Sequence, residues 1–115
     1  MPDVKVYVVD RVTTKPGYGK KFVDGYLSEY APGARQRNMS LISILVSPPL
    51  WSETESNVVT ITWTVAGVAG WWSMTRQGRA DPSIGRWWTE QEPLIVERTR
   101  SMAADASDLE LLIDV

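Results

Sequence analysis

The chain has 115 residues, of which 43% are hydrophobic and 23% charged, and we expect residues 1–115 to form one globular domain. Its net charge of -2 shows no basic excess, so nucleic acid and anionic membrane surfaces are not expected partners. The sequence contains no cysteine and no histidine, which excludes disulfides, thiolate nucleophiles and the commonest metal and haem ligands. We therefore expect neither a metal nor a cofactor.

The sequence also shows no pattern typical of a membrane-spanning helix or of a secretory signal. No apolar run approaches the roughly 18–20 residues that a membrane-spanning helix requires. The start, Met1 to Val4, lacks the basic region and apolar stretch of a secretory signal. We expect a cytoplasmic protein that does not enter a membrane.

The chain begins with a predicted strand and a predicted helix. Residues 4–14 are rich in valine and threonine and end at the turn Lys15-Pro16-Gly17. Residues 18–30 then carry apolar side chains at helical spacing, namely Phe22, Val23, Tyr26, Leu27 and Tyr30. A short helical continuation would be closed by Asn38, because asparagine tolerates the left-handed backbone conformation at a helix end.

Two further strands are predicted after this helix. Residues 39–47 form an apolar run that stops at two prolines, which cannot donate to a strand ladder. Residues 57–65 alternate apolar side chains with threonine. The connection between them is short enough to join antiparallel neighbours, and it carries an apolar tip at Leu50 and Trp51.

Two Trp-Trp doublets characterise the next segment. Trp71-Trp72 and Trp87-Trp88 occupy the same offsets, i+3 and i+4, from an apolar residue that precedes each pair. Asp81-Pro82 lies between the doublets and provides a helix N-cap followed by proline at the first helical position. The pattern predicts one broken helical region that presents both doublets inward. Because neighbouring positions differ by about 100° around a helix, one tryptophan of each pair should face the sheet and the other a pocket rim.

The end of the chain is less clearly patterned. Residues 94–102 suit a helix by spacing and a strand by their β-branched residues, and we favour a fourth strand. Residues 107–115 form an apolar tail whose leucines need a partner surface, in this subunit or in another.

The predicted order is strand, helix, strand, strand, helix, strand. This is the α+β arrangement of the ferredoxin-like split βαβ fold, a four-stranded antiparallel sheet with both helices on one face. The first two predicted strands carry apolar residues on both faces, so the uncovered face would be an apolar patch. A second copy related by a twofold axis is the simplest cover, and we expect a homodimer.

At this level the chain resembles the dimeric α+β barrel superfamily, which includes antibiotic biosynthesis monooxygenase-like, EthD-like and NIPSNAP-like proteins. The resemblance rests on the element order and on the stretches "VTTKPGYGKKFVDGY", "RQRNMSLISILVSPP" and "WWTEQEPLIVERTRSM". It implies a homodimeric barrel with a cavity between sheet and helices in each subunit. Members include cofactor-independent oxygenases of polycyclic aromatics, which use Asn, Trp, Tyr and Arg, as well as cyclases, decarboxylases and haem enzymes. The haem branches usually use a histidine ligand, which this chain lacks.

Aromatic side chains are the main candidates for a substrate-binding site. Inward aromatics either simply fill the core or line an apolar pocket, since flat rings with a polar N–H or O–H suit both roles. The candidates are Tyr26, Trp63, Trp71, Trp72, Trp87 and Trp88.

The candidate catalytic residues are Arg98, Tyr7 and Asp10. On the predicted fourth strand, Arg98 shares a face with apolar residues, so it should pair with Asp10 or Glu97, or bind an anionic oxygen. A tyrosine would donate a proton to a carbonyl oxygen if its pKa were suitably tuned. The remaining arginines, including Arg100, are expected to be solvated.

Three functions agree with these patterns. The first is a cofactor-independent enzyme, monooxygenase-like or cyclase-like, acting on a hydrophobic aromatic or polycyclic small molecule. The second is a small-molecule-binding protein without turnover, and the third is a dimerisation or protein-interaction module. Inward tryptophans favour the first two functions, whereas an exposed Trp51 would favour the third.

Overall fold

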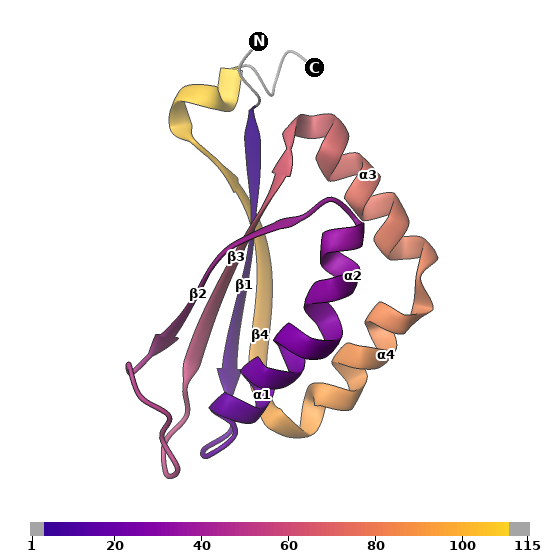
Figure 1. Cartoon of the computed structure of the whole chain (residues 1–115). Helices are drawn as coiled ribbons and strands as arrows, with labels where there is room; N and C mark the ends of the chain where they lie inside the picture. The colour runs from indigo at the N-terminus through magenta and orange to yellow at the C-terminus, as the bar shows by residue number, and fades with distance from the viewer. Residues whose placement is uncertain (1–3, 111–115) are drawn as a thin grey trace.

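The fold is an antiparallel sheet with helices packed on one of its faces (Figure 1). This computed structural model describes residues 4–110. The strands are β1 (Lys5–Thr14), β2 (Ser40–Ser47), β3 (Val58–Ala66) and β4 (Ile95–Ala104). They are hydrogen-bonded in the order β2-β3-β1-β4, so the first and third strands are central. This is the predicted ferredoxin-like α+β fold.

The helices form two connected stretches on that face of the sheet (Figure 1). The first comprises α1 (Gly19–Gly25), the π-helical segment η1 (Tyr26–Tyr30) and α2 (Ala31–Gln36). The second comprises α3 (Gly67–Ala80), α4 (Pro82–Gln91) and the 3₁₀ turn η2 (Glu92–Leu94), and a further turn, η3 (Ala106–Asp108), follows β4. No helix within residues 4–110 is both long and apolar enough to cross a membrane.

Local signals in the sequence set the ends of these elements. Asn38 adopts a φ of 64° two residues after the end of α2, as predicted for the residue that closes this helix. The Asp81 carboxylate accepts the Ser83 backbone N–H at 2.9 Å and so caps α4, with Pro82 at the first helical position. Residues 95–104 form a strand, which confirms the choice of strand over helix. The predicted apolar tail reaches residues 111–115, which lie outside the described residues.

The core lies between the sheet and the helices. Alternate residues of the two central strands point toward the helices and are fully buried, including Val8, Val12, Ile61 and Trp63. They meet aromatic side chains from the helices, of which Phe22, Tyr26, Tyr30, Trp87 and Trp88 are all buried.

The opposite face of the sheet is mixed rather than uniformly apolar. In β3 this face carries threonines, as the alternation in the sequence predicts. In β1 it carries half-buried Tyr7 and Val9. In β2, Ile42 and Leu45 are more than half exposed, and the register against β3 shifts between Leu41 and Ser43. Apolar exposure on this face is therefore concentrated on the edge strand β2.

Candidate functional site

A largely buried ion pair joins the central strand β1 to its neighbour, the edge strand β4. Asp10 of β1 and Arg100 of β4 are direct register partners, so their side chains point to the same face. Arg100 Nε donates to Asp10 Oδ1 at 2.6 Å and Arg100 Nη2 donates to Asp10 Oδ2 at 2.9 Å. The Asp10 side chain is 2% exposed and the Arg100 side chain 28% exposed. The pair is bidentate, which fixes the plane of the guanidinium group.

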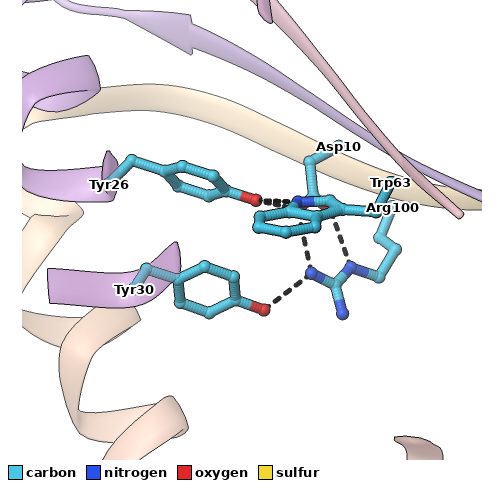
Figure 2. Close-up of polar contacts among 5 residues, drawn as sticks. All are labelled: Asp10, Tyr26, Tyr30, Trp63 and Arg100. Atoms are coloured by element: carbon cyan, nitrogen blue, oxygen red, sulfur yellow. Dashed lines mark hydrogen bonds and ion pairs between the residues drawn. The ribbon is translucent and has the colours of Figure 1, made fainter. Parts of the chain in front are cut away.

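Two aromatic side chains complete the inner side of this pair (Figure 2). Trp63 Nε1 donates to the Tyr26 oxygen at 2.6 Å, and the Tyr26 hydroxyl donates to Asp10 Oδ2 at 3.1 Å. Both carboxylate oxygens of Asp10 are therefore engaged. This arrangement leaves the carboxylate as a buried anchor for Arg100 rather than as a free base.

Tyr30 lies on the outer side of the same arginine (Figure 2). Arg100 Nη2 donates to the Tyr30 oxygen at 2.8 Å. Within residues 4–110 the Tyr30 hydroxyl is bonded only as an acceptor, so its own O–H is available to donate. The rings of Tyr26 and Tyr30 are stacked with centroids 4.8 Å apart, which holds Tyr30 in this position.

The electrostatics separate the roles of these groups. Burial, together with the nearby charge of Asp10, raises the pKa of Tyr26 far above its usual range, so this phenol stays neutral. Burial by itself would lower the pKa of Arg100, but the hydrogen bonds and charge of Asp10 outweigh it and raise that pKa. Arg100 is therefore a permanent cation beside the free O–H of Tyr30.

Tyr30 and Arg100 both line a cavity of about 290 Å³ between the helices and β4. Its apolar wall is formed by Trp71, Met74, Ile84 and Met102. The other lining residues are Arg37, Thr75, Gly78 and Arg79. The site thus joins an apolar surface to a fixed cation and a hydroxyl donor, which is the composition of a small-molecule site.

The two tryptophan doublets occupy different environments. Trp71 lines the cavity, and its indole N–H is buried without a hydrogen-bond partner in the described part of the chain. Trp72 is 49% exposed, so the prediction that both doublets face inward is wrong for this residue. Trp87 and Trp88 are both buried, because aromatic rings from the first helical stretch, including Phe22, pack against them.

The other predicted site residues are dispersed. Arg98 stacks its guanidinium 4.1 Å from the Trp88 ring centroid and lines a separate cavity of about 270 Å³. Tyr7 lies on the opposite face of the sheet from Asp10, because the two positions differ by an odd number of residues in β1. Of the predicted catalytic residues, only Asp10 belongs to the cluster around Arg100.

The arginine that pairs with Asp10 is Arg100, and the expectation that Arg100 is solvated is wrong. Strand periodicity places both Arg98 and Arg100 on the helix-facing side of β4, so parity alone does not distinguish them. The register of β1 against β4 decides the pairing. Tyr30 belonged to the predicted helical stripe, but its hydroxyl reaches Arg100 only in the folded sheet-helix arrangement.

Metal chemistry finds no support in the donor groups. Among residues 4–110, no three Asp or Glu side chains come together in a way that could hold a metal ion.

No protein-family model matches this chain, and no curated protein matches its sequence. Solved structures do match its fold. A NIPSNAP family protein of unknown function from Agrobacterium tumefaciens superposes with a TM-score of 0.69 at 12% identity, over 92% of each chain. An uncharacterized NIPSNAP domain protein from Burkholderia xenovorans superposes with a TM-score of 0.69 at 13% identity, over 89% of this chain and 95% of its own. At such identities the likeness concerns the fold alone, and this chain has the fold of NIPSNAP family proteins.

Proposed function

We propose that the chain binds a small apolar molecule in the cavity beside Tyr30 and polarises an oxygen of that molecule without a cofactor. One observation carries the proposal. Tyr30 has an unused O–H at the cavity wall, and Arg100, which Asp10 fixes in place, donates to the same phenol oxygen. A donor held in this way is preorganised for an oxygen that gains negative charge during a reaction.

The size of the cavity narrows the class of ligand. Its volume of about 290 Å³ corresponds to the space of about ten water molecules at roughly 30 Å³ each. It lies just below the range of about 300–1,000 Å³ for drug-sized ligands. A molecule with one aromatic ring or a short apolar chain fits this space better than the polycyclic substrate that the sequence suggested.

The chemistry that suits these groups is enolisation or a related rearrangement. Tyr30 would donate a hydrogen bond to a carbonyl oxygen, and the Arg100 charge would stabilise the enolate-like state. The described cavity wall contains no Asp or Glu, so the proton acceptor would be the substrate itself, water or a buffer base. The site is thus better equipped to stabilise an oxyanion than to abstract a proton.

Exchange of the methyl protons of acetophenone in deuterated buffer tests this activity directly. We expect the protein to accelerate exchange by about 10²-fold, the lower end of the range for a positioned proton donor. Tyr30→Phe should abolish the acceleration, whereas Tyr18→Phe, an exposed tyrosine outside the cavity, should retain it. The measurement is the decay of the methyl proton NMR signal.

Binding is measured separately by saturation-transfer NMR with acetophenone and phenol. Binding without accelerated exchange would favour a non-catalytic binding protein. Absence of binding by either probe, with Tyr30→Phe indistinguishable from the parent, would refute the site. The remaining alternative, a protein-interaction module, is favoured by the exposed Leu50 and Trp51 at the tip of the β2–β3 loop.

We also propose that the chain is a homodimer in which a second copy covers the open sheet face. Ile42 and Leu45 are more than half exposed on β2, next to an extended row of threonines. A twofold pair of such faces would bury these side chains. Sedimentation equilibrium at micromolar concentration should give the dimer mass, and Leu45→Lys should shift the distribution toward monomer. A monomer mass for the parent chain would refute this assembly.

A further inference from the structure

The cavity beside Tyr30 is lined by an excess of positive charge. Arg37, Arg79 and Arg100 all contribute to its wall, and among the described residues no Asp or Glu does. Asp10 compensates the charge of Arg100 from behind. The other two guanidinium groups have no carboxylate oxygen within 4.0 Å in the described part of the chain.

Arg37 is the more unusual of these two cations. It is 7% exposed, and its Nε atom is buried without a hydrogen-bond partner among residues 4–110. Its guanidinium lies 5.8 Å from the Tyr30 ring centroid, which gives it an aromatic neighbour but no acceptor. A buried cation without an acceptor is costly, so a missing anionic partner would improve its environment.

Two carboxylates close to Arg37 already have other partners. Glu29 and Asp81 line a small adjoining crevice of about 50 Å³ together with Arg37. The Asp81 carboxylate accepts from the backbone and hydroxyl of Ser83, and Glu29 accepts from Trp87 Nε1 at 3.4 Å. The charges of Glu29 and Asp81 partly offset the charge of Arg37 in the crevice. Neither carboxylate lines the larger cavity beside Tyr30.

The remainder of the wall specifies an apolar body. Met74 is buried, Trp71 and Ile84 are partly buried against the core, and Met102 is partly exposed at this wall. The indole N–H of Trp71 is a further buried donor without an acceptor. The cavity thus combines two guanidinium groups that lack a carboxylate partner and a free hydroxyl donor with aliphatic and aromatic walls, and no described side chain of its wall carries a negative charge.

From this arrangement we propose that the ligand of the cavity is a monocarboxylic acid with a single-ring or short-chain apolar body, bound as its carboxylate. This inference rests on the proposed function of the same cavity and specifies its substrate class. The carboxylate lies toward Arg37 and Arg79, since planar guanidinium groups match its two oxygens. The apolar body packs on Trp71 and Ile84, and Tyr30 faces any further oxygen of the ligand.

Titration calorimetry with matched acids and amides tests the inference. The probes are benzoate, cinnamate and octanoate, each compared with its primary amide, which has a similar shape and no charge. We expect at least one acid to bind tenfold or more tightly than its amide, because hydrogen bonds to charged groups are the stronger ones. Arg37→Gln and Arg79→Gln should each remove most of this preference and leave binding of the amides within about twofold.

Two arginines on the same helices serve as controls. Arg35 on α2 and Arg76 on α3 are exposed and do not line the cavity, so Arg35→Gln and Arg76→Gln should keep the full preference for acids. If the buried Arg37→Gln variant does not fold, the exposed Arg79→Gln variant decides the result.

The outcomes separate this inference from the function on which it rests. Equal affinity for acids and amides, with acetophenone or phenol still binding, would overturn the carboxylate assignment and leave the cavity as a neutral-ligand site. A preference for acids that Arg35→Gln removes as strongly as Arg79→Gln does would also overturn it. If neither the acids nor the neutral probes bind, both the ligand class and the proposed function are wrong.

Discussion

The two Trp-Trp doublets have the same spacing in the sequence and opposite surroundings in the fold. Trp87 and Trp88 on α4 are both buried in an aromatic cluster with Phe22 and Tyr30, whose ring centroids lie 5.2–6.2 Å from theirs. Trp72 on α3 is about half exposed. A doublet always directs its rings to different sides of a helix, so both rings are buried only where neighbours cover both sides.

The first helical stretch supplies those neighbours for α4 alone. Phe22 belongs to α1 and Tyr30 to η1, and both pack against the α4 doublet. Beside Trp71 of α3, the cavity lies between the helices and β4. The α4 doublet therefore packs into an aromatic cluster, although Trp88 also borders the cavity that Arg98 lines, whereas Trp71 borders the cavity beside Tyr30. We call the part of the helix layer around the α4 doublet the filled half and the part around the α3 doublet the open half.

The largest difference between the halves should appear on truncation of one ring from each doublet. We expect Trp87→Ala to lower the free energy of unfolding by about 3–5 kcal/mol, since it removes a buried ring from a packed cluster. Trp72→Ala should lower it by less than about 1 kcal/mol, because this residue is about half exposed. Urea denaturation measures both. Similar losses for the two variants would contradict the distinction between a filled and an open half.

Two ion pairs provide a second contrast, of smaller size. Asp10→Asn would leave Arg100 without its counter-charge in a mostly buried position, and we expect a loss of about 3 kcal/mol, the lower end for breaking a buried pair. Asp24→Asn breaks the exposed pair with Lys20 on α1, whose two side chains are both more than half exposed, and should cost no more than about 0.5 kcal/mol. The same urea experiment applies, and equal costs would show that the Asp10–Arg100 pair is not structural.

Much of the fold is predictable from the sequence because its elements have strong local periods. The alternation of residues 57–65, the helical stripe of residues 18–30 and the cap at Asp81 each specify one element without reference to the others. Tertiary packing is not specified in this way. Identical spacing of the doublets predicted identical burial, and the different neighbours of α3 and α4 produced different burial.

The candidate site was harder to predict for the same reason. Strand parity identified a face that carries Arg98 and Arg100, but the choice between them depends on how β1 and β4 align. That alignment includes a shift between Thr13 and Thr14, which no local pattern reveals. Tyr30 acquires its role from an arginine 70 positions away in the chain, and such a contact exists only after folding.

The smallest expected effect concerns the junction between the two halves, where Asp81 caps α4. Asp81 Oδ1 accepts from Ser83 N at 2.9 Å and from Ser83 Oγ at 2.6 Å. We expect Asp81→Ala to lower the melting temperature by about 2–4 °C, because loss of a cap frays the first turn of a helix that carries the buried doublet. Thermal unfolding followed by circular dichroism measures the shift.

Asp105 provides a control with the same local geometry at a different place. Asp105 Oδ1 accepts from Ser107 N at 2.9 Å and from Ser107 Oγ at 2.6 Å, but the turn that it caps, η3, has only three residues. Asp105→Ala should therefore shift the melting temperature by less than about 1 °C. Hydrogen bonds from these serines lower the pKa of both carboxyls below the ordinary aspartate value of 3.8. A carboxyl whose pKa is lowered by folding stabilises the protein fully above pH 3.8, and this stabilisation is lost as the pH falls through the lower pKa of the folded state. The difference in melting temperature between the parent and Asp81→Ala should therefore shrink only below pH 3.8. Equal changes in melting temperature for the two variants would mean that Asp81 stabilises only its own turn and not the α4 helix that carries the buried doublet.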